Sequence, residues 1–271
     1  MHKTEISEGK QYHIRCKPGD LAKYLLVPGD PERVPKIVKY WDSASEVSYH
    51  REFRAFTGTY KGVPISALSS GIGPACMSIV VNEARLVGVE TFIRVGSCGA
   101  IQDYIECGDL VILTAAVRLD RTSECYIPVE YPAVANYDVV QALIQACEEL
   151  GYRYHVGIGC TTCDFYAGQQ RPTFQHSQNS NLIETLRKAN VLIFEMEAAT
   201  LFVLASLYRL RSGAICAVYA NRIKDEFKPG AGEEKCIKAA NKAVKILNEW
   251  DKKKNKAKKK WLYPSMLKCK A

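Results

Sequence analysis

Short apolar runs alternate along this chain with segments of helical periodicity, and this alternation is the feature that most constrains its fold. The apolar runs predict strands at residues 24–27, 46–53, 57–69 with a turn at 61–62, 91–95, 109–118, 155–162, 191–194 and 213–219. Helices are predicted at residues 32–41, 76–87, 137–150, 196–210 and 233–250, with one more before residue 191 and a polar loop at 167–180. Such alternation favours a largely parallel sheet covered by helices. No internal repeat or linker divides the 271 residues, which predict one α/β domain.

The formal net charge of +8 is concentrated near the C-terminus. Nine lysines and no acidic residue follow from Lys252 onward, and the rest of the chain holds 28 basic and 29 acidic residues. A nearly neutral body does not indicate a nucleic-acid groove. We therefore predict a domain over residues 1–251 and a lysine-rich extension over residues 252–271. Residues 252–260 are expected to form a solvated, frayed helix end, and binding of the tail to an acidic partner or a membrane surface is the alternative.

The first residues lack the apolar core of a signal peptide, and the most apolar later stretch contains Glu195 and Glu197. The eleven cysteines are odd in number and mostly lie in apolar runs, which is typical of free thiols in a reducing compartment. Cys160 and Cys163 form a CxxC pair without further ligands at readable spacing, so no metal site is expected. These features predict a soluble, cytoplasmic protein that does not enter a membrane.

Three arginines occur at the ends of predicted strands: Arg33, Arg51 and Arg94. A single arginine beside a turn is usually a surface salt-bridge partner. Three in equivalent places point instead to an oxyanion, because a strand end followed by glycine exposes N–H groups and a guanidinium matches phosphate geometry. Phosphate is therefore the first ligand that we expect.

Two glycine-containing segments exclude other chemistries. Residues 71–76 begin like a dinucleotide fingerprint but lack its last glycine. Residues 96–99 lack the glycines that a serine nucleophile elbow places two residues before and after the serine. The sequence therefore supports neither a Rossmann cofactor nor a serine hydrolase.

Ligands of open α/β sheets bind outside the carboxyl ends of the strands. This rule selects one group of candidate residues: Gly29, Arg94, Ser97, Phe165, Glu195, Glu197 and Arg222. Glu195 and Glu197 flank Met196 at the start of an apolar helix, where carboxylates are costly to bury without partners. They either stabilise the helix N-terminus or accept hydrogen bonds from the vicinal hydroxyls of a sugar, with the methionine against the ring.

Five ordered segments carry a family resemblance that extends to about Trp250: residues 27–34, 48–53, 94–100, 164–171 and 194–201. Together they resemble uridine phosphorylase, a family of hexamer-forming nucleoside phosphorylases. The resemblance implies an α/β fold whose mixed, partly barrel-like central sheet is flanked by helices. It also implies reversible phosphorolysis of uridine to uracil and ribose 1-phosphate in pyrimidine salvage, with inorganic phosphate as co-substrate and no cofactor.

The resemblance also implies roles for individual residues. The phosphate would be bound by Gly29, Arg33, Arg94 and Ser97, and by Arg51 of a neighbouring subunit. The ribose would be bound by Glu195, Met196, Glu197 and, across the subunit interface, His13. Uracil would be read by Phe165, Gln169, Arg171 and Arg222. Arg94, Glu197 and Arg222 would carry the catalysis, within a homo-oligomer that is a dimer or a hexamer built as a trimer of dimers.

Alternatives to this function remain open at the level of sequence. Purine-cleaving relatives usually carry an aspartate where this chain has Asn221-Arg222-Ile223, so pyrimidines are favoured over a purine nucleoside phosphorylase of the same fold. A catalytically inactive nucleoside-binding protein would keep the pocket without turnover. A scaffold would use the lysine tail for docking to an acidic partner. The three phosphate arginines together with the ribose glutamate weigh against both.

Overall fold

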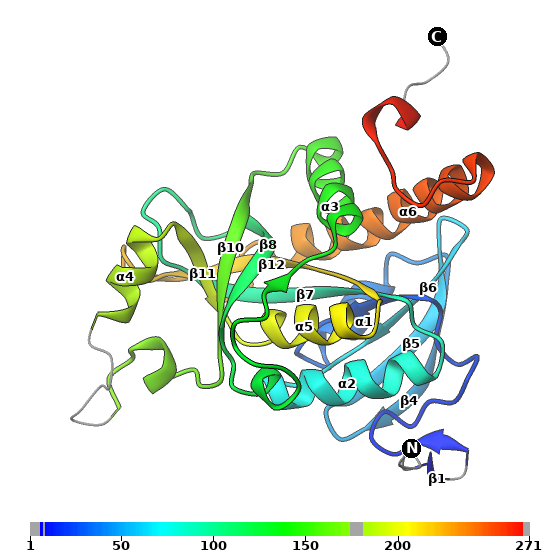
Figure 1. The fold of residues 1–271 in the computed structure, drawn as a ribbon, viewed down its shortest axis with the longest axis horizontal. Helices are drawn as coiled ribbons and strands as arrows, with labels where there is room; N and C mark the ends of the chain where they lie inside the picture. The colour runs from blue at the N-terminus through cyan, green and yellow to red at the C-terminus, as the bar shows by residue number, and fades with distance from the viewer. Residues whose placement is uncertain (1–5, 8, 174–180, 268–271) are drawn as a thin grey trace.

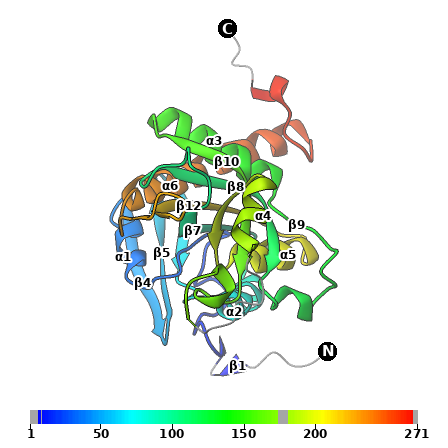
Figure 2. The same cartoon turned by 90° about the vertical axis from the view of Figure 1, so that its left-hand side faces the viewer.

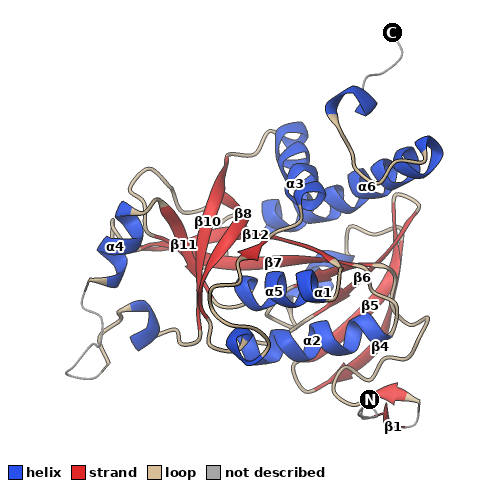
Figure 3. Ribbon diagram, in the orientation of Figure 1, coloured by secondary structure: helices blue, strands red, loops and turns tan. Residues whose placement is uncertain are grey.

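The computed structural model describes residues 6–7, 9–173 and 181–267, and it consists of a twisted central sheet with helices on both faces (Figure 1, Figure 3). The strands are β1 Ile6–Ser7, β2 Lys10–Gln11, β3 Tyr24–Val27, β4 Ser43–His50, β5 Phe53–Tyr60, β6 Val63–Leu68, β7 Thr91–Ala100, β8 Leu110–Leu119, β9 Ala133–Val134, β10 Tyr154–Thr162, β11 Val191–Glu195, β12 Arg211–Asn221 and β13 Glu226–Phe227. The α-helices are α1 Arg33–Val38, α2 Pro74–Leu86, α3 Tyr137–Leu150, α4 Leu182–Lys188, α5 Ala198–Leu207 and α6 Glu233–Ala257.

Five strands of the main sheet close on themselves in the order β12, β8, β10, β11 and β7, because β7 also pairs with β12. From β7 the sheet continues as an open wing through β3, β6, β5 and β4. Parallel and antiparallel pairings occur side by side, as in the antiparallel contact of β12 with β8 and the parallel contact of β8 with β10. The mixed, partly barrel-like sheet is thus confirmed, and the largely parallel sheet expected from alternation alone is wrong.

Strand β7 changes neighbours along one of its edges. Residues Thr91 to Arg94 pair with β3, and only Gly99 and Ala100 pair with β11. Between these two pairings, residues 95–98 have a strand partner only on the other edge, where β12 runs alongside the whole of β7. This opening in the ladder lies near the carboxyl ends of β3 and β12, where ligands gather in α/β folds.

The helices bury two apolar layers, one on each side of the sheet. Helices α2 and α5 pack on one side and α1, α3 and α6 on the other (Figure 2). Helix α5 is apolar all round, which is why it is buried along most of its length, from Ala198 to Ala205. Helix α3 begins at the side-chain cap of Asn136 and ends at Gly151, which adopts a left-handed conformation with φ 65°. These bounds match the predicted helix.

Some predicted elements differ from the structure at their ends. The predicted strand 46–53 is interrupted by a turn at Arg51, whose φ of 57° ends β4 and allows β5 to begin at Phe53. The predicted helices 32–41 and 196–210 are both shorter than expected, and the strand predicted at 91–95 continues to Ala100. The predicted loop at 167–180 contains a 3₁₀ turn over Ala167–Gln169, and residues 174–180 lie outside the described residues.

The lysine-rich C-terminal segment is docked onto the body. Helix α6 continues without fraying to Ala257, across the predicted domain boundary. Lys254 is buried, and its Nζ lies 2.6 Å from Oδ2 of Asp138 on α3 and 3.0 Å from Oδ1 of Asp251. Leu262 then packs into the same apolar layer as α6. The expectation of a frayed end is therefore wrong, although the other lysines from 252 to 260 are exposed. Within the described residues, no helix is both long and apolar enough to cross a membrane.

Candidate active site

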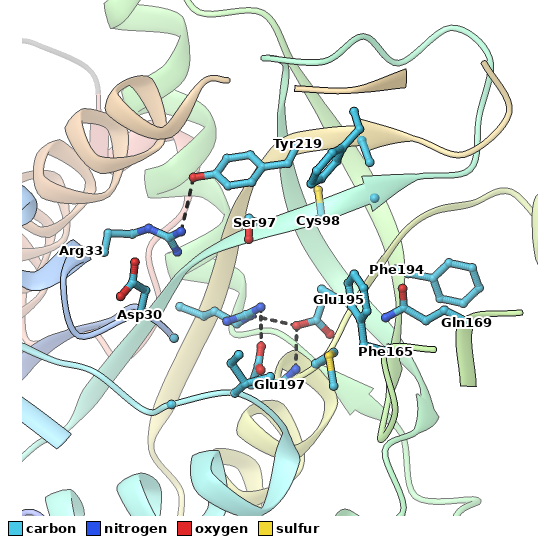
Figure 4. A pocket seen from close by; sticks show the side chains of 18 of the residues that line it. Asp30, Arg33, Ser97, Cys98, Phe165, Gln169, Phe194, Glu195, Glu197 and Tyr219 are labelled. Carbon is cyan, nitrogen blue, oxygen red and sulfur yellow. Dashed lines mark hydrogen bonds and ion pairs between the residues drawn. The ribbon is translucent and has the colours of Figure 1, made fainter. Parts of the chain in front are cut away.

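A cavity of about 670 Å³ opens at the carboxyl ends of β3, β7 and β12 (Figure 4). Ten of the residues predicted from the sequence line it: Gly29, Arg33, Arg94, Ser97, Phe165, Gln169, Arg171, Glu195, Met196 and Glu197. This volume falls in the range of about 300–1,000 Å³ typical of small-molecule sites. The carboxyl ends of these strands therefore bring together side chains that are far apart in the sequence.

Arg94 forms the centre of a buried ion-pair network. Its Nε donates to Oε2 of Glu195 at 2.8 Å, and its Nη2 lies 2.5 Å from Oε2 of Glu197. Burial opposes the guanidinium charge, but the two carboxylates outweigh it and hold the pKa of Arg94 above its usual value. Two buried carboxylates thus fix the position of a permanently charged cation. Arg94 itself lines the cavity.

Glu195 is saturated by donors of the protein itself. The hydroxyl of Thr161 donates to Oε1, and the backbone N–H groups of Glu197 and Ala198 donate to Oε2 at 2.8 and 2.9 Å. Together with Arg94, these donors leave Glu195 as the cap of the α5 N-terminus, where the helix dipole also favours a negative charge. A sugar contact of Glu195 is therefore disfavoured, and its geometry positions Arg94.

Glu197 keeps acceptor capacity toward the cavity. Its Oε1 accepts the backbone N–H of Gly73 at 2.6 Å, while Oε2 faces Arg94. Burial raises the pKa of Glu197, and the charge of Arg94 opposes this effect. Each oxygen of the carboxylate contacts one donor of the protein, so each retains a lone pair for hydroxyl groups. Met196 is half-buried beside it in the cavity wall.

Arg33 is held at the opposite wall by residues of β12 and α6. Its Nε donates to Oε2 of Glu233 at 3.0 Å, its Nη1 to the carbonyl of Val95 at 3.2 Å, and its Nη2 to the Tyr219 hydroxyl at 3.3 Å. Tyr219 in turn donates to Glu233 at 2.6 Å. Figure 4 shows Arg33 and Tyr219 pointing toward one another beside Ser97. The first turn of α6 thereby fixes the second cavity arginine.

The opening in the edge of β7 lies at the cavity floor. Arg33 donates to the carbonyl of Val95, so the carbonyl at this point of β7 faces the open side. Alternate residues of a strand direct their backbone groups to the same edge, so the N–H of Ser97 faces the same side as the Val95 carbonyl. A hydroxyl and a free N–H of Ser97 are thus available next to Arg33 and Arg94.

The other end of the cavity holds an aromatic ring, an amide and one guanidinium group. Arg171 lies 3.8 Å above the ring of Phe165, and its Nη1 donates to Oε1 of Gln169 at 2.6 Å. Gln169 is buried, and its Nε2 donates to Thr162 at 3.0 Å. Burial lowers the pKa of Arg171, and the nearby charge of Arg222 lowers it further. This end can stack a planar ring and bind its polar edge.

Three predicted site residues do not line the cavity in this single copy: His13, Arg51 and Arg222. Arg222 lies directly behind the wall, where its Nη1 donates to the carbonyl of Gln169 at 3.1 Å. Arg51 is exposed on the β4–β5 turn, with its guanidinium 5.7 Å from the ring of Tyr12. His13 contacts Glu83 through Nδ1 at 2.5 Å.

Several lining residues escaped the sequence reasoning. They are Asp30, Pro31, Glu52, Gly71, Ile72, Cys98, Gly99, Phe194, Tyr219, Ala220 and Phe227. The segment 71–73 carried a usable signal, because its two glycines have φ values of 75° and 98°, which favour glycine, and the N–H of Gly73 donates to Glu197. No local pattern marks Tyr219 or Phe227. Tyr219 lies on β12, which pairs with the distant strand β7, and Phe227 is held beside the cavity by the pairing of β13 with β12.

No group of three or more histidine, cysteine, aspartate or glutamate side chains in the described ranges is arranged to hold a metal ion. The cysteines of the same ranges are free thiols. Cys98 lines the cavity, but burial raises its pKa well above the usual value. A neutral, buried thiol is a poor nucleophile.

Residues 23–249 match the model of the phosphorylase superfamily. The chain is 55% identical over 267 residues to the uridine phosphorylase of Thermococcus kodakarensis, an alignment that covers 97% of this chain and 96% of that protein. It is 36% identical over 252 residues to the uridine phosphorylase of Escherichia coli, covering 90% of this chain and 98% of the relative. The guanosine phosphorylase of Halorubrum lacusprofundi is also 36% identical, over 235 residues that cover 87% and 93% of the two chains.

Proposed function

Because this chain belongs to the phosphorylase superfamily, we propose that it catalyses the reversible phosphorolysis of uridine to uracil and ribose 1-phosphate. The observation that carries this function is one cavity with fixed arginines at one end and an amide with a guanidinium at the other. The first set suits an oxyanion nucleophile and the second the polar edge of a pyrimidine. Two of the three named relatives, at 55% and 36% identity, are uridine phosphorylases.

Arg33 and Arg94 bind the phosphate co-substrate in this proposal, together with Ser97 and the backbone of Gly29. Both guanidiniums are held by carboxylates, so they keep their directions before the ligand arrives. Orientation of a nucleophile by such fixed groups can supply several kcal/mol, up to roughly 7–11 in ideal cases. The reaction needs no cofactor here and no covalent intermediate with the protein.

Glu197 accepts hydrogen bonds from the ribose 2′- and 3′-hydroxyls, and Met196 packs against the sugar. The cleaved N-glycosidic bond leaves positive character on the ribose, which the incoming phosphate and the Glu197 carboxylate stabilise. Glu195 acts indirectly, since its oxygens are filled by Arg94 and the α5 N-terminus. One displacement by phosphate at C1′ then releases the base and inverts the anomeric centre.

Gln169 and Arg171 bind the polar edge of uracil, and Phe165 covers its face. Arg222 supports them from behind through the carbonyl of Gln169. The negative charge that develops on the departing base is stabilised by these preorganised donors. A purine would require a different set of donors at this end of the cavity.

A second copy of the chain completes the site by supplying Arg51 and His13. Both residues lie outside the cavity of their own copy. They are close to each other in the fold, because Nδ1 of His50, the residue before Arg51, lies 3.0 Å from the carbonyl oxygen of His13. Glu52, which follows Arg51, lines the cavity at its open side. The active unit is therefore a homodimer at least, and a hexamer would repeat it three times. A cytoplasmic location stays a prediction.

The decisive assay measures base release from uridine and inosine, each with and without phosphate. We expect phosphate-dependent release of uracil and little hypoxanthine. Release that is independent of phosphate would identify a nucleosidase. Preferential cleavage of inosine or guanosine would favour the purine function of the Halorubrum relative. Saturable binding of uridine without turnover would favour a nucleoside-binding protein.

A further inference from the structure

A second pocket, of about 420 Å³, lies at the opposite ends of the same strands. We call it the C-terminal pocket, and it is lined by Lys23, Glu90, Arg209, Leu210, Arg211, Asp251, Lys254, Asn255, Lys259 and Lys260. Lys23 precedes β3, Glu90 precedes β7 and Arg211 begins β12, so the pocket lies at the amino ends of these three strands. The C-terminal end of α6 closes its other side. It shares no lining residue with the catalytic cavity.

The floor of the C-terminal pocket is built from paired charges. Arg211 binds Asp251 with two parallel hydrogen bonds of 2.8 Å each, and the Tyr24 hydroxyl donates to the same carboxylate at 2.6 Å. Burial opposes ionisation of Asp251, but the hydrogen bonds from Arg211 and Tyr24 outweigh it and lower its pKa to about 2. Lys254 is buried between Asp251 and Asp138. This floor is rigid and close to neutral.

The rim carries positive charge without partners. Among the described residues, no carboxylate lies within ion-pair distance of Lys23, Arg209, Lys259 or Lys260. Lys23 and Lys260 lie only over the rings of Tyr24 and Trp261, at 5.0 and 5.6 Å. The four cations come from three segments that are distant in the sequence and meet only in the folded chain. Glu90 is the one acidic residue at this rim among those described.

Two helix ends place these cations there. Helix α5 ends with Arg209 in a left-handed conformation of φ 58°, and the N–H of Leu210 donates back to Ala205 at 2.8 Å. Helix α6 ends in the same way, with Lys258 at φ 51° and the N–H of Lys259 donating to Lys254 at 3.0 Å. Glycine is the usual residue at such left-handed positions, because a side chain there is unfavourable.

The four rim cations also carry more positive charge than the partial negative charges of the two helix C-termini can balance. Each helix C-terminus is equivalent to roughly −0.5 charge, so two ends account for about one of the unpaired cations. Glu90 offsets one more. A surplus of about two positive charges remains around a polar pocket in which Leu210 is the one apolar residue among the described lining residues. An anion that carries two or more negative charges satisfies this surplus.

The geometry points to a binding site for an anion with two adjacent phosphoryl groups. A single phosphate would reach only part of a pocket of this volume, whereas two linked phosphoryl groups can contact cations on separate segments. The polar lining offers no surface for a base, so the organic part of a nucleoside diphosphate would extend outside. Inorganic pyrophosphate and a nucleoside diphosphate thus present the same chemistry to the pocket.

The test is isothermal calorimetry on the full chain with pyrophosphate and, in parallel, ADP. The triple variant Arg209→Gly, Lys259→Gln, Lys260→Gln removes three rim cations, and glycine at position 209 suits the left-handed backbone. The control variant Lys252→Gln, Lys253→Gln removes two exposed lysines of helix α6 that lie outside the pocket. Uridine phosphorolysis by the triple variant, which we expect to be unchanged, reports that the fold is intact.

We expect pyrophosphate binding that weakens at least tenfold in the triple variant and less than twofold in the control. Tighter binding of ADP than of pyrophosphate would identify a nucleotide as the ligand, and the reverse order an inorganic one. Absence of binding overturns the proposal. Equal weakening in both variants would show unspecific attraction to the lysines, and unchanged binding in the triple variant would show that the anion binds elsewhere. Either result overturns the proposal. Because the readout is binding, failure of the proposed catalytic function would leave this test valid.

Discussion

The two cavities at opposite ends of β3, β7 and β12 hold their cations in different ways. In the catalytic cavity, Arg33 and Arg94 are buried and each is fixed by a carboxylate. In the C-terminal pocket the paired cations form the floor, and those that face a ligand are exposed and unpaired. A fixed guanidinium is preorganised and therefore suits catalysis, whereas an exposed lysine must lose side-chain freedom when it binds.

This difference predicts that single substitutions will have large effects where they remove a buried, paired cation or its support, and small effects where they remove an exposed, unpaired cation. Removal of a paired, buried cation leaves its carboxylate without a partner, which is costly. Removal of an unpaired cation from an exposed rim leaves no carboxylate without its partner. Four substitutions, taken from the largest expected effect to the smallest, test this contrast.

Arg94→Ala is expected to have the largest effect, because it leaves Glu195 and Glu197 buried without their cation. We expect kcat/KM for phosphate to fall on the order of 10²–10³-fold, as after removal of a preorganised donor. The free energy of unfolding should fall by about 3–5 kcal/mol, as when a buried ion pair is broken. Steady-state kinetics and urea denaturation measure the two effects. Arg94→Lys, which keeps the charge, should recover most of the stability, and kcat/KM within tenfold of the wild type in Arg94→Ala would refute the role of Arg94.

Lys254→Met removes the cation that links α6 to α3 and isolates Asp138, whose Oδ1 already has no hydrogen-bond partner. We expect a loss of about 3 kcal/mol in unfolding free energy, measured by urea denaturation. The matched control is Lys253→Met, at the neighbouring exposed position. Equal stability of the two variants would show that the extension contributes nothing to the fold.

Glu233→Gln weakens the support of Arg33 without removing the arginine. Loss of a charged hydrogen bond is worth about 1.5–3 kcal/mol, so the KM for phosphate should rise about tenfold while the kcat changes less. A hydrogen bond to Tyr219 remains possible in the glutamine variant, which keeps the side chain in place. An unchanged phosphate KM would show that Arg33 does not need this carboxylate.

The same substitution has a pH signature. Burial would raise the pKa of Glu233, but hydrogen bonds from Lys36 and Tyr219 and the charge of Arg33 lower it to about 2 from its ordinary value of 4.5. A lowered folded-state pKa stabilises the fold above 4.5, and this stabilisation is lost as the pH falls toward 2. The midpoint temperature of unfolding should therefore fall less between pH 6 and pH 2 in Glu233→Gln than in the wild type. An equal fall of the midpoint temperature with pH in the two proteins would contradict the pKa shift.

Arg209→Gly is expected to have the smallest effect and the opposite sign. Glycine relieves the left-handed backbone at this helix end, so the unfolding free energy should rise by up to about 1 kcal/mol. Arg209→Ala, which removes the charge and keeps the strain, should give no gain. Destabilisation by Arg209→Gly would mean that the arginine makes a stabilising contact in the folded protein, and the contrast between the two cavities would then be weaker.

Local patterns were sufficient to predict much of the fold. The predicted strand 24–27 and the predicted helix 137–150 coincide with β3 and α3, because a short apolar run between turns and a capped amphipathic segment both specify themselves locally. The closure of β7 onto β12 has no such signal, since pairing between distant strands depends on the whole chain. This is why alternation alone predicted a parallel sheet and the family resemblance predicted the mixed one.

The site was predictable where chemistry and strand ends coincide. Gly29, Arg94 and Ser97 could be placed in one cleft by the strand-end rule alone. Tyr219 and Glu233 could not, because their role is to hold another side chain and nothing in their local sequence marks it. Lys254 was lost in a run of lysines, where only the position of Asp138 on α3 distinguishes it from its neighbours.

The change of neighbours along β7 also fixes how much of its main chain the cavity floor offers to a ligand. Pairing with β3 stops at Arg94 and pairing with β11 starts at Gly99, five residue steps later, or about 16 Å of strand. The length of this unpaired stretch of main chain is thus set by strand pairing on either side of it. Substitutions in the wall can alter which nucleoside binds, but a longer or shorter unpaired stretch would require a change in the pairing of β7 itself.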